Sequence, residues 1–279
     1  MDRFEGRIAV VTGGGTGIGR ELVRQLAAAG AHVSMCDLSE ANMAESKALA
    51  EKEAPAGTRI TTFVADVADE ARVNAFRDHV VVEHGAAAVH LLFNNAGIGG
   101  GGSFVAGDRD EWERTFGVCW GGVYNGCRAF VPLLVAAEEA HLVNVSSVNG
   151  FWASLGPQTA HTAYSAAKFA VKGFTEALVN DLRLNAPHVG VSVVMPGHIG
   201  TSIVINSMAI LGHQLEDPSL GELFRDSAPT SAEQAAATIL DGVRERRWRI
   251  LVGDDARALD ERVRLDPERA YDPSFTFSG

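Results

Sequence analysis

The chain has 279 residues, of which 46% are hydrophobic and 21% are charged, a balance typical of a globular protein with a sizeable core. Its 24 Lys and Arg residues against 35 Asp and Glu residues give a formal net charge of −11 at pH 7, which repels phosphate backbones and acidic membrane surfaces. Composition therefore argues against nucleic-acid and membrane partners and favours a small-molecule partner.

Seven short apolar runs, rich in β-branched residues, follow one another along the chain. They span residues 8–12, 32–37, 60–66, 89–95, 141–147, 191–197 and 248–253. Longer amphipathic stretches lie between them, such as 19–30 and 69–85, and both of these end on a glycine, as helices often do. Strands that are apolar on both faces and alternate with helices predict an α/β fold with a doubly wound parallel sheet of about seven strands. We expect a single domain spanning 1–279.

Two segments depart from this alternation. Residues 202–228 follow a strand with a mixed helical pattern and are predicted to form a lid over a substrate cleft. Residues 255–279 are charged and then rich in turn residues, which indicates a surface or subunit-contact tail. The charged residues 1–7 do not resemble a signal peptide and no apolar run is long enough to span a bilayer, so a cytoplasmic protein is expected.

The three cysteines are Cys36, Cys119 and Cys127, and no two of them form a CxxC pair. An odd number without close spacing argues against a disulfide framework and against a structural zinc site. We therefore expect reduced, mostly buried thiols and no metal site.

The run TGGGTGIG, from Thr12 to Gly19, joins the first predicted strand to the first predicted helix. A P-loop would continue with Lys and Ser or Thr, but Arg20 follows here, and the GxGxxG fingerprint fits in no register. The spacing that fits is TGxxxGxG. Such glycines allow close backbone approach to a pyrophosphate at the helix N-terminus, although a purely structural glycine turn is the alternative when the loop is taken alone.

Asp37 closes the second predicted strand eighteen residues after Gly19. A carboxylate at this place accepts hydrogen bonds from the ribose hydroxyls of an adenine dinucleotide, although it would also serve as a cap for a helix starting near Ser39. A 2′-phosphate about 4 Å away would meet up to about 4 kcal/mol of repulsion at intermediate dielectric. Position 16 is Thr rather than a cation. The sequence therefore predicts NAD(H) in preference to NADP(H).

Further motifs follow in a fixed order. They are Asp66-Val67, NNAG at residues 94–97, Ser147, YxxxK from Tyr164 to Lys168, and PGHIGT at residues 196–201. Together with the TGxxxGxG loop they resemble the short-chain dehydrogenase/reductase family over residues 6 to about 252. The resemblance implies a Rossmann-type fold and hydride transfer between a nicotinamide cofactor and a secondary alcohol or ketone.

Tyr164 and Lys168 are four residues apart and share one face of a helix. A phenol with a pKa near 10 is only about 0.1% ionised at pH 7, so proton transfer through it requires a lowered pKa. Lys168 and the positive ring of an oxidised nicotinamide are expected to lower it. The resemblance implies that Tyr164 is the general acid and base, that Lys168 also holds the ribose, and that Ser147 hydrogen-bonds the substrate oxygen.

The resemblance also implies a set of cofactor contacts. They are Gly13, Gly15, Thr16, Gly17, Ile18, Gly19, Asp37, Asp66, Val67, Asn95, Tyr164, Lys168, Ile199 and Thr201. Asp66 would alternatively begin the next helix, and turn chemistry explains Pro196-Gly197 almost as well. The family commonly forms homodimers or homotetramers through the two long helices that precede and contain the Tyr-Lys pair.

The chain departs from the family at Cys119, where the family places an Asn that supports a water in the proton relay. A thiol hydrogen-bonds weakly, so it is a poor replacement, and Asn125 is not in register to substitute. Either backbone carbonyls hold the water and activity survives, or proton exchange is slowed. The second outcome motivates another hypothesis: a cofactor-binding protein with weakened catalysis that acts as a sensor or assembly subunit.

The segment between Ser147 and Tyr164 is longer than is common in the family, and it carries Phe151, Trp152, Leu155 and His161. With the apolar start of the predicted lid, these side chains indicate a lipophilic or cyclic substrate. Core packing explains the aromatic residues equally well. His161 and His198 are candidates for orienting a substrate, with local hydrogen bonding as the alternative.

Overall fold

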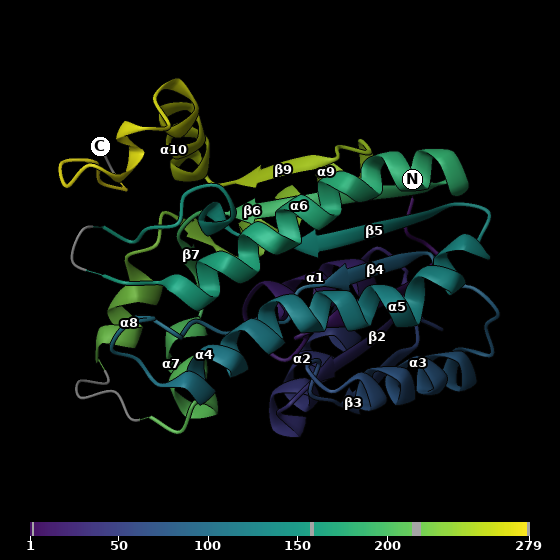
Figure 1. The fold of residues 1–279 in the computed structure, drawn as a ribbon. Coiled ribbons are helices and arrows are strands. Elements are labelled where there is room, and N and C mark those ends of the chain that lie inside the picture. The colour runs from purple at the N-terminus through teal and green to yellow at the C-terminus, as the bar shows by residue number, and fades with distance from the viewer. Residues whose placement is uncertain (2, 157–158, 214–218, 278–279) are drawn as a thin grey trace.

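Seven parallel strands form the central sheet in the order β3-β2-β1-β4-β5-β6-β9 (Figure 1). The computed structural model describes residues 1, 3–156, 159–213 and 219–277. The strands are β1 (Ile8–Thr12), β2 (His32–Asp37), β3 (Ile60–Val64), β4 (Leu91–Asn94), β5 (Ala140–Val145), β6 (Val189–Pro196) and β9 (Arg249–Val252). Two shorter strands, β7 (Ile199–Gly200) and β8 (Thr230–Ser231), pair beside them.

Every strand of the central sheet was predicted, and several end earlier than the apolar runs. All five residues of β1 and all six of β5 are buried, as expected for strands covered on both faces. The polar residues Asp66, Asn95 and Ser147 lie beyond their strands. They enter loops at the carboxyl edge of the sheet, and this edge is where the candidate site lies.

Helices cover both faces of the sheet. The ten α-helices among the described residues are α1 (Gly17–Ala28), α2 (Glu40–Glu53), α3 (Glu70–His84), α4 (Arg109–Phe116), α5 (Gly122–Val135), α6 (Thr162–Asn185), α7 (Ile203–Ile210), α8 (Ser219–Asp226), α9 (Ala232–Arg244) and α10 (Asp254–Leu265). Residues of α1, α2 and α9 share one apolar cluster with the sheet, and residues of α3, α5 and α6 share the other. The doubly wound α/β architecture is confirmed.

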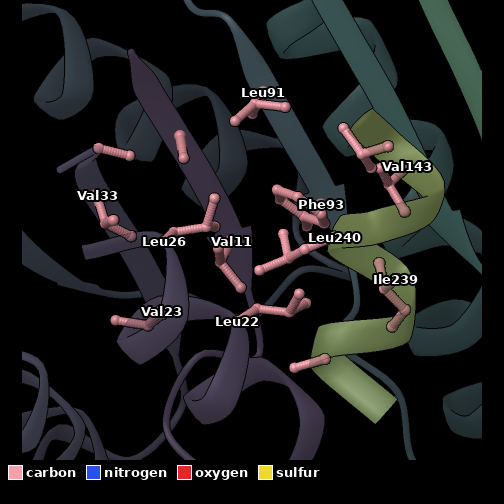
Figure 2. Close-up of a cluster of buried hydrophobic side chains, with 14 of the residues drawn as sticks. Val11, Leu22, Val23, Leu26, Val33, Leu91, Phe93, Val143, Ile239 and Leu240 are labelled. Atoms are coloured by element: carbon pink, nitrogen blue, oxygen red, sulfur yellow. The ribbon is translucent and has the colours of Figure 1, made fainter. Parts of the chain in front are cut away.

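Figure 2 shows the first of these clusters. Val11 of β1 and Phe93 of β4 are fully buried against Leu22 and Leu26 of α1 and Leu240 of α9. Burial of side chains of this size stabilises a fold by about 2 kcal/mol each. This packing fixes α1 against β1, and with it the turn that joins them.

A third cluster is formed by the C-terminal segment and the loop after β5. Trp152 is 1% exposed, its Nε1 donates a hydrogen bond to the carbonyl of Ala270 at 2.6 Å, and its ring contacts those of Phe275 and Phe277. Phe151 packs against the same cluster. The two aromatic residues considered for a substrate pocket are therefore packing residues, because α10 and the segment after it enclose them.

The cysteines are free and buried, as predicted. Over the residues that the structure describes, no helix is long and apolar enough to cross a bilayer. Within the same residues, no group of three or more His, Cys, Asp or Glu side chains is arranged to hold a metal ion.

Candidate active site

The glycine loop lies at the reversal of strand order, where β2 pairs with one side of β1 and β4 with the other. Gly13 has φ +67° and Gly17 has φ +55°, a region that side chains rarely adopt. A Cβ at Gly19 would lie 1.9 Å from the carbonyl oxygen of Gly13. The loop is therefore closed so tightly over the start of α1 that only glycine fits, and it leaves backbone N–H groups at a helix N-terminus for an anion.

Asp37 lies directly beside this loop. Its Oδ2 accepts a hydrogen bond from the Gly15 N–H at 3.0 Å, and its Oδ1 accepts one from the Ser39 N–H at 3.1 Å. The cap of α2 is Ser39, whose hydroxyl accepts from the Asn42 N–H. Asp37 is thus not the helix cap. Its carboxylate joins the end of β2 to the glycine loop, and its remaining lone pairs are available to ribose hydroxyls.

Asn95 ties the loop after β4 to the glycine loop. Its Nδ2 donates to the carbonyl of Thr12 at 3.0 Å and to that of Gly13 at 3.3 Å. The Thr12 hydroxyl in turn accepts from the N–H groups of Asn95 and Ala96, both at 3.0 Å. On the other side, the methyl group of Thr201 is the atom nearest to a Cβ at Gly17, and Ile199 is 5% exposed in the adjoining β7.

Asp66 and Val67 occupy the loop between β3 and α3. Asp69, not Asp66, caps α3, so Asp66 does not begin the helix. The Asp66 carboxylate accepts from the Ala68 N–H and forms an ion pair with Arg114 of α4 at 2.6 Å. Arg114 has no signal in the sequence as a partner of Asp66, because only the fold brings α4 beside this loop.

The three residues proposed for catalysis meet at the end of β5. Lys168 is 3% exposed and its Nζ donates to the carbonyl of Val145 at 3.0 Å, while the same Nζ lies 5.3 Å from the centre of the Tyr164 ring. The Ser147 hydroxyl oxygen accepts from the Asn149 N–H at 3.1 Å. That bond uses a lone pair of the oxygen, so the hydroxyl keeps its proton for donation, and the side chain is also hydrogen-bonded with Tyr164.

Burial raises the pKa of the Tyr164 phenol above its ordinary value near 10, and the Cys119 thiol raises it further. Lys168 and a hydrogen bond with Ser147 oppose this shift but do not reverse it. The lowered pKa expected from the sequence is therefore not reached by this chain's own groups. The cost of burying a phenolate outweighs the nearby cation, and the positive ring of an oxidised cofactor is the remaining group that would lower this pKa.

Cys119 lies in a π-helical turn, Gly117–Gly121, between α4 and α5. Such turns are rare and occur mostly as single-turn insertions. The thiol is 0% exposed and donates to the carbonyl of Ile98 at 3.1 Å. A Cβ at Gly97 would lie 3.4 Å from the Lys168 Nζ and 3.7 Å from the Cys119 Sγ, so the thiol and the ammonium border the same space. Asn125 instead donates to the carbonyl of Val67.

The segment predicted as a lid contains α7 and α8, and its residues 214–218 lie outside the described residues. Asn206 of α7 donates to the Thr16 hydroxyl at 3.1 Å, and the Ser207 hydroxyl accepts from the Gly99 N–H at 2.8 Å. In Figure 1, α7 and α8 lie on the side toward which the arrowheads of β4, β5 and β9 point. Helix α7 therefore lies at the carboxyl edge of the sheet beside the glycine loop.

The two histidines that were candidates for orienting a substrate, His161 and His198, differ in their hydrogen bonding. The His198 Nε2 is hydrogen-bonded to the carbonyl of Phe224 at 2.7 Å, and its backbone N–H donates to Asp255 at 2.7 Å, so local hydrogen bonding accounts for it. The contact of Asp255 with the loop after β6 had no signal in the sequence. The ring of His161 lies 4.7 Å from that of Tyr164 between centroids.

The residues present fit a dinucleotide. The glycine turn, in which a Cβ at Gly19 would clash with the backbone, lies at a helix N-terminus, a carboxylate lies beside it, and a buried ammonium lies next to a tyrosine. These are the groups that would hold a pyrophosphate and two riboses.

Known proteins share this arrangement. Residues 7–209 match the family described as short chain dehydrogenase. A Mycobacterium tuberculosis protein provisionally named oxidoreductase SadH is 37% identical over 266 residues, 95% of this chain and 92% of that protein. The levodione reductase of Leifsonia aquatica is 34% identical over 210 residues, 74% of each chain. A crystal structure of a Burkholderia phymatum short chain dehydrogenase/reductase in complex with NAD has a TM-score of 0.83 and 31% identity, covering 96% of this chain and 95% of that chain.

The family match spans most of the chain, and the M. tuberculosis relative extends the likeness over nearly all of it. The fold, the glycine turn and the Tyr164 and Lys168 pair agree with that likeness. Sequence, structure and relatives therefore lead to one conclusion: this chain belongs to the short chain dehydrogenase family of oxidoreductases.

Proposed function

We propose that the protein is an NAD-dependent oxidoreductase that interconverts a secondary alcohol and a ketone. The observation that carries this proposal is the grouping of Ser147, Tyr164 and Lys168 at the carboxyl end of β5. When bound, a nicotinamide cofactor supplies or accepts the hydride. The glycine loop, Asp37, Asn95 and Thr201 would hold it, because they line one continuous edge of the fold.

The chain's own residues handle the proton. In ketone reduction the Tyr164 Oη donates a proton to the carbonyl oxygen, and its raised pKa keeps that proton in place at neutral pH. The Ser147 hydroxyl donates a hydrogen bond to the same oxygen. The Lys168 ammonium stabilises the tyrosinate that remains, because it is buried within reach of the ring.

The first test is a titration with NADH and, separately, with NADPH, followed by the fluorescence of the reduced nicotinamide. Tight NADH binding with much weaker NADPH binding supports the proposal, and a screen of secondary alcohols and ketones follows. Binding of neither cofactor would overturn it. The NAD in the related B. phymatum structure favours the first result.

Removal of the Asp37 charge should change cofactor preference. In Asp37→Asn the repulsion of a 2′-phosphate disappears while a hydrogen-bonding group remains. NADPH should therefore bind about tenfold to a hundredfold more tightly. This gain is smaller than the unscreened Coulomb repulsion would give, because salt screens the two charges. NADH should weaken a few-fold. The measurement is the pair of dissociation constants by fluorescence titration. The control Asp241→Asn removes a charge on the exposed side of α9 and should alter neither dissociation constant. An unchanged NADPH affinity in Asp37→Asn would show that Asp37 does not select the cofactor.

The variant Cys119→Asn distinguishes a fully active enzyme from one whose catalysis is weakened. The Cys119 thiol is buried, borders the same space as the Lys168 ammonium and offers only a weak hydrogen bond. Cys119→Asn should therefore raise kcat several-fold at an unchanged dissociation constant for NADH, as measured by steady-state kinetics with matched titrations. An unchanged kcat would mean that the relay is complete without an amide. A gain from near zero to normal turnover would favour a native sensor or assembly subunit.

We propose a lipophilic or cyclic ketone as the substrate class. Ile203, Val204 and Ile205 lie half-buried at the start of α7, and Leu155 is exposed in the loop before α6. The relative named levodione reductase favours a ketone.

A homodimer or homotetramer is proposed through α5 and α6, which expose the apolar side chains of Tyr124, Phe169 and Leu184. Size-exclusion chromatography with light scattering tests this, and a monomer mass would contradict it. The proposed location is the cytoplasm.

A further inference from the structure

We propose that His161 is a substrate-binding residue that favours ketones with a second oxygen close to the reacting carbonyl. This inference rests on the proposed function, since it concerns the substrate side of Tyr164. It assigns a specificity role to a residue outside the Ser147, Tyr164 and Lys168 group.

His161 is held in place by its backbone neighbours. It immediately precedes α6, and the next two residues donate their N–H groups to the loop after β4: Thr162 to the carbonyl of Gly102 at 2.9 Å and Ala163 to that of Gly101 at 3.0 Å. The Thr162 hydroxyl also accepts from the Trp112 Nε1 at 3.1 Å. The backbone that carries the His161 side chain is therefore anchored to the loop after β4 and to α4.

The imidazole lies against the catalytic tyrosine. The two ring centroids are 4.7 Å apart and the planes are inclined by 40°. Burial lowers the pKa of His161 to about 4, so the ring is neutral at pH 7 and offers one N–H donor and one nitrogen acceptor. A substrate whose carbonyl oxygen meets the Tyr164 hydroxyl would bring its neighbouring atoms to this ring.

The hydrogen-bonding capacity of His161 is unused within the described part of the chain. Seven of the nine histidines have a hydrogen-bond partner there, and the two without one are His79 and His161. His79 lies on α3, where its ring centroid is 5.2 Å from that of Phe63. It is not one of the residues proposed for catalysis. The His161 nitrogens are not among the fully buried atoms that lack a partner, so in the free protein water can satisfy them, and a ligand oxygen can take the place of that water. Beside Tyr164, that ligand is the substrate.

His79 also supplies a matched control, because it is likewise an unpartnered histidine packed on an aromatic ring. The experiment compares the wild type with His161→Phe, His161→Gln and His79→Phe. The probes are cyclohexanone and its α-hydroxy derivative as substrates. The corresponding alcohol and vicinal diol serve as ligands of the protein–NADH complex, followed by nicotinamide fluorescence.

The wild type should prefer the α-hydroxy ketone by about fivefold to tenfold in kcat/KM, the value of one net hydrogen bond. His161→Phe should abolish this preference mainly through KM, because the bond forms in the ground state as well as in the transition state. His161→Gln, which keeps a donor and an acceptor, should retain part of it. His79→Phe should leave it unchanged.

Two results would overturn the proposal. One is a His161→Phe enzyme that loses activity equally toward both ketones, as expected of a packing residue; the other is a preference that survives the substitution. Failure of the proposed function is distinguishable, because then no ketone is reduced by the wild type. In that case the affinities for alcohol and diol still decide the role of His161.

Discussion

Tyr164→Phe should lower kcat by about a thousandfold or more while NADH binds within a few-fold of its wild-type affinity. The substitution removes only the hydroxyl group, so the ring keeps its contacts with His161 and with the Lys168 ammonium. General acid and base catalysis contributes about 10² to 10⁴ in rate, and here the hydroxyl also orients the substrate oxygen. Single-turnover kinetics with saturating cofactor, together with a fluorescence titration, measure both quantities.

Tyr124→Phe is the control for this substitution, because it removes the same group from an exposed tyrosine on α5. It should leave kcat unchanged. An active Tyr164→Phe enzyme would refute the proposed mechanism. The raised pKa of Tyr164 also sets the pH dependence: the phenol is protonated below its pKa, so ketone reduction should stay level through the neutral range and decline only at alkaline pH. Alcohol oxidation needs the deprotonated form and should rise with pH.

Gly19→Ala should abolish tight cofactor binding, with a loss of about a hundredfold or more in NADH affinity. A Cβ at this position would lie 1.9 Å from the carbonyl oxygen of Gly13, so the turn must open. Helix propensity alone would favour Ala over Gly in α1 by about 1 kcal/mol. The steric clash outweighs this gain in helix propensity. To relieve a contact this short, the backbone of the loop must move, and its N–H groups then no longer point toward the anion site. We expect a lower melting temperature as well as weaker binding.

Gly117→Ala provides the comparison for this change. Gly117 has helical backbone angles, φ −59° and ψ −42°, and the nearest atom to an added Cβ is the Ala68 side chain at 3.8 Å. The same substitution there should preserve NADH affinity and change the melting temperature little. NADH titration and thermal unfolding of both variants test the argument. Near-normal affinity in Gly19→Ala would show that the loop does not need its closed form to bind.

The strands and the glycine loop were predictable because their signals are local. An apolar run such as residues 8–12 identifies a buried strand, and the spacing of Gly13, Gly17 and Gly19 specifies a turn before a helix. The order of the motifs along the chain, through its resemblance to a known family, then indicated which strands end beside the glycine loop.

Other features of the site were not predictable, because they depend on contacts between distant residues. The partner of Asp66 is Arg114, and that of the His198 backbone is Asp255; neither pair has a spacing that a pattern detects. The π-helical turn at Gly117–Gly121 is a change of backbone hydrogen bonding without a characteristic side chain. For Tyr164 the sequence revealed the neighbouring cation but not the burial that outweighs it.

The enclosure of Trp152 by the C-terminal segment has a consequence for biosynthesis. The hydrogen bond from Trp152 to Ala270 spans 118 residues, and at about 5–20 residues per second the ribosome needs roughly 6–24 s to add them. The strands that carry the glycine loop can pair during this interval, while the loop that follows Ser147 still lacks its cover. A nascent chain would therefore form the strands around the glycine loop first, and the loop that follows Ser147 would be covered only after the segment containing Ala270 has been synthesised.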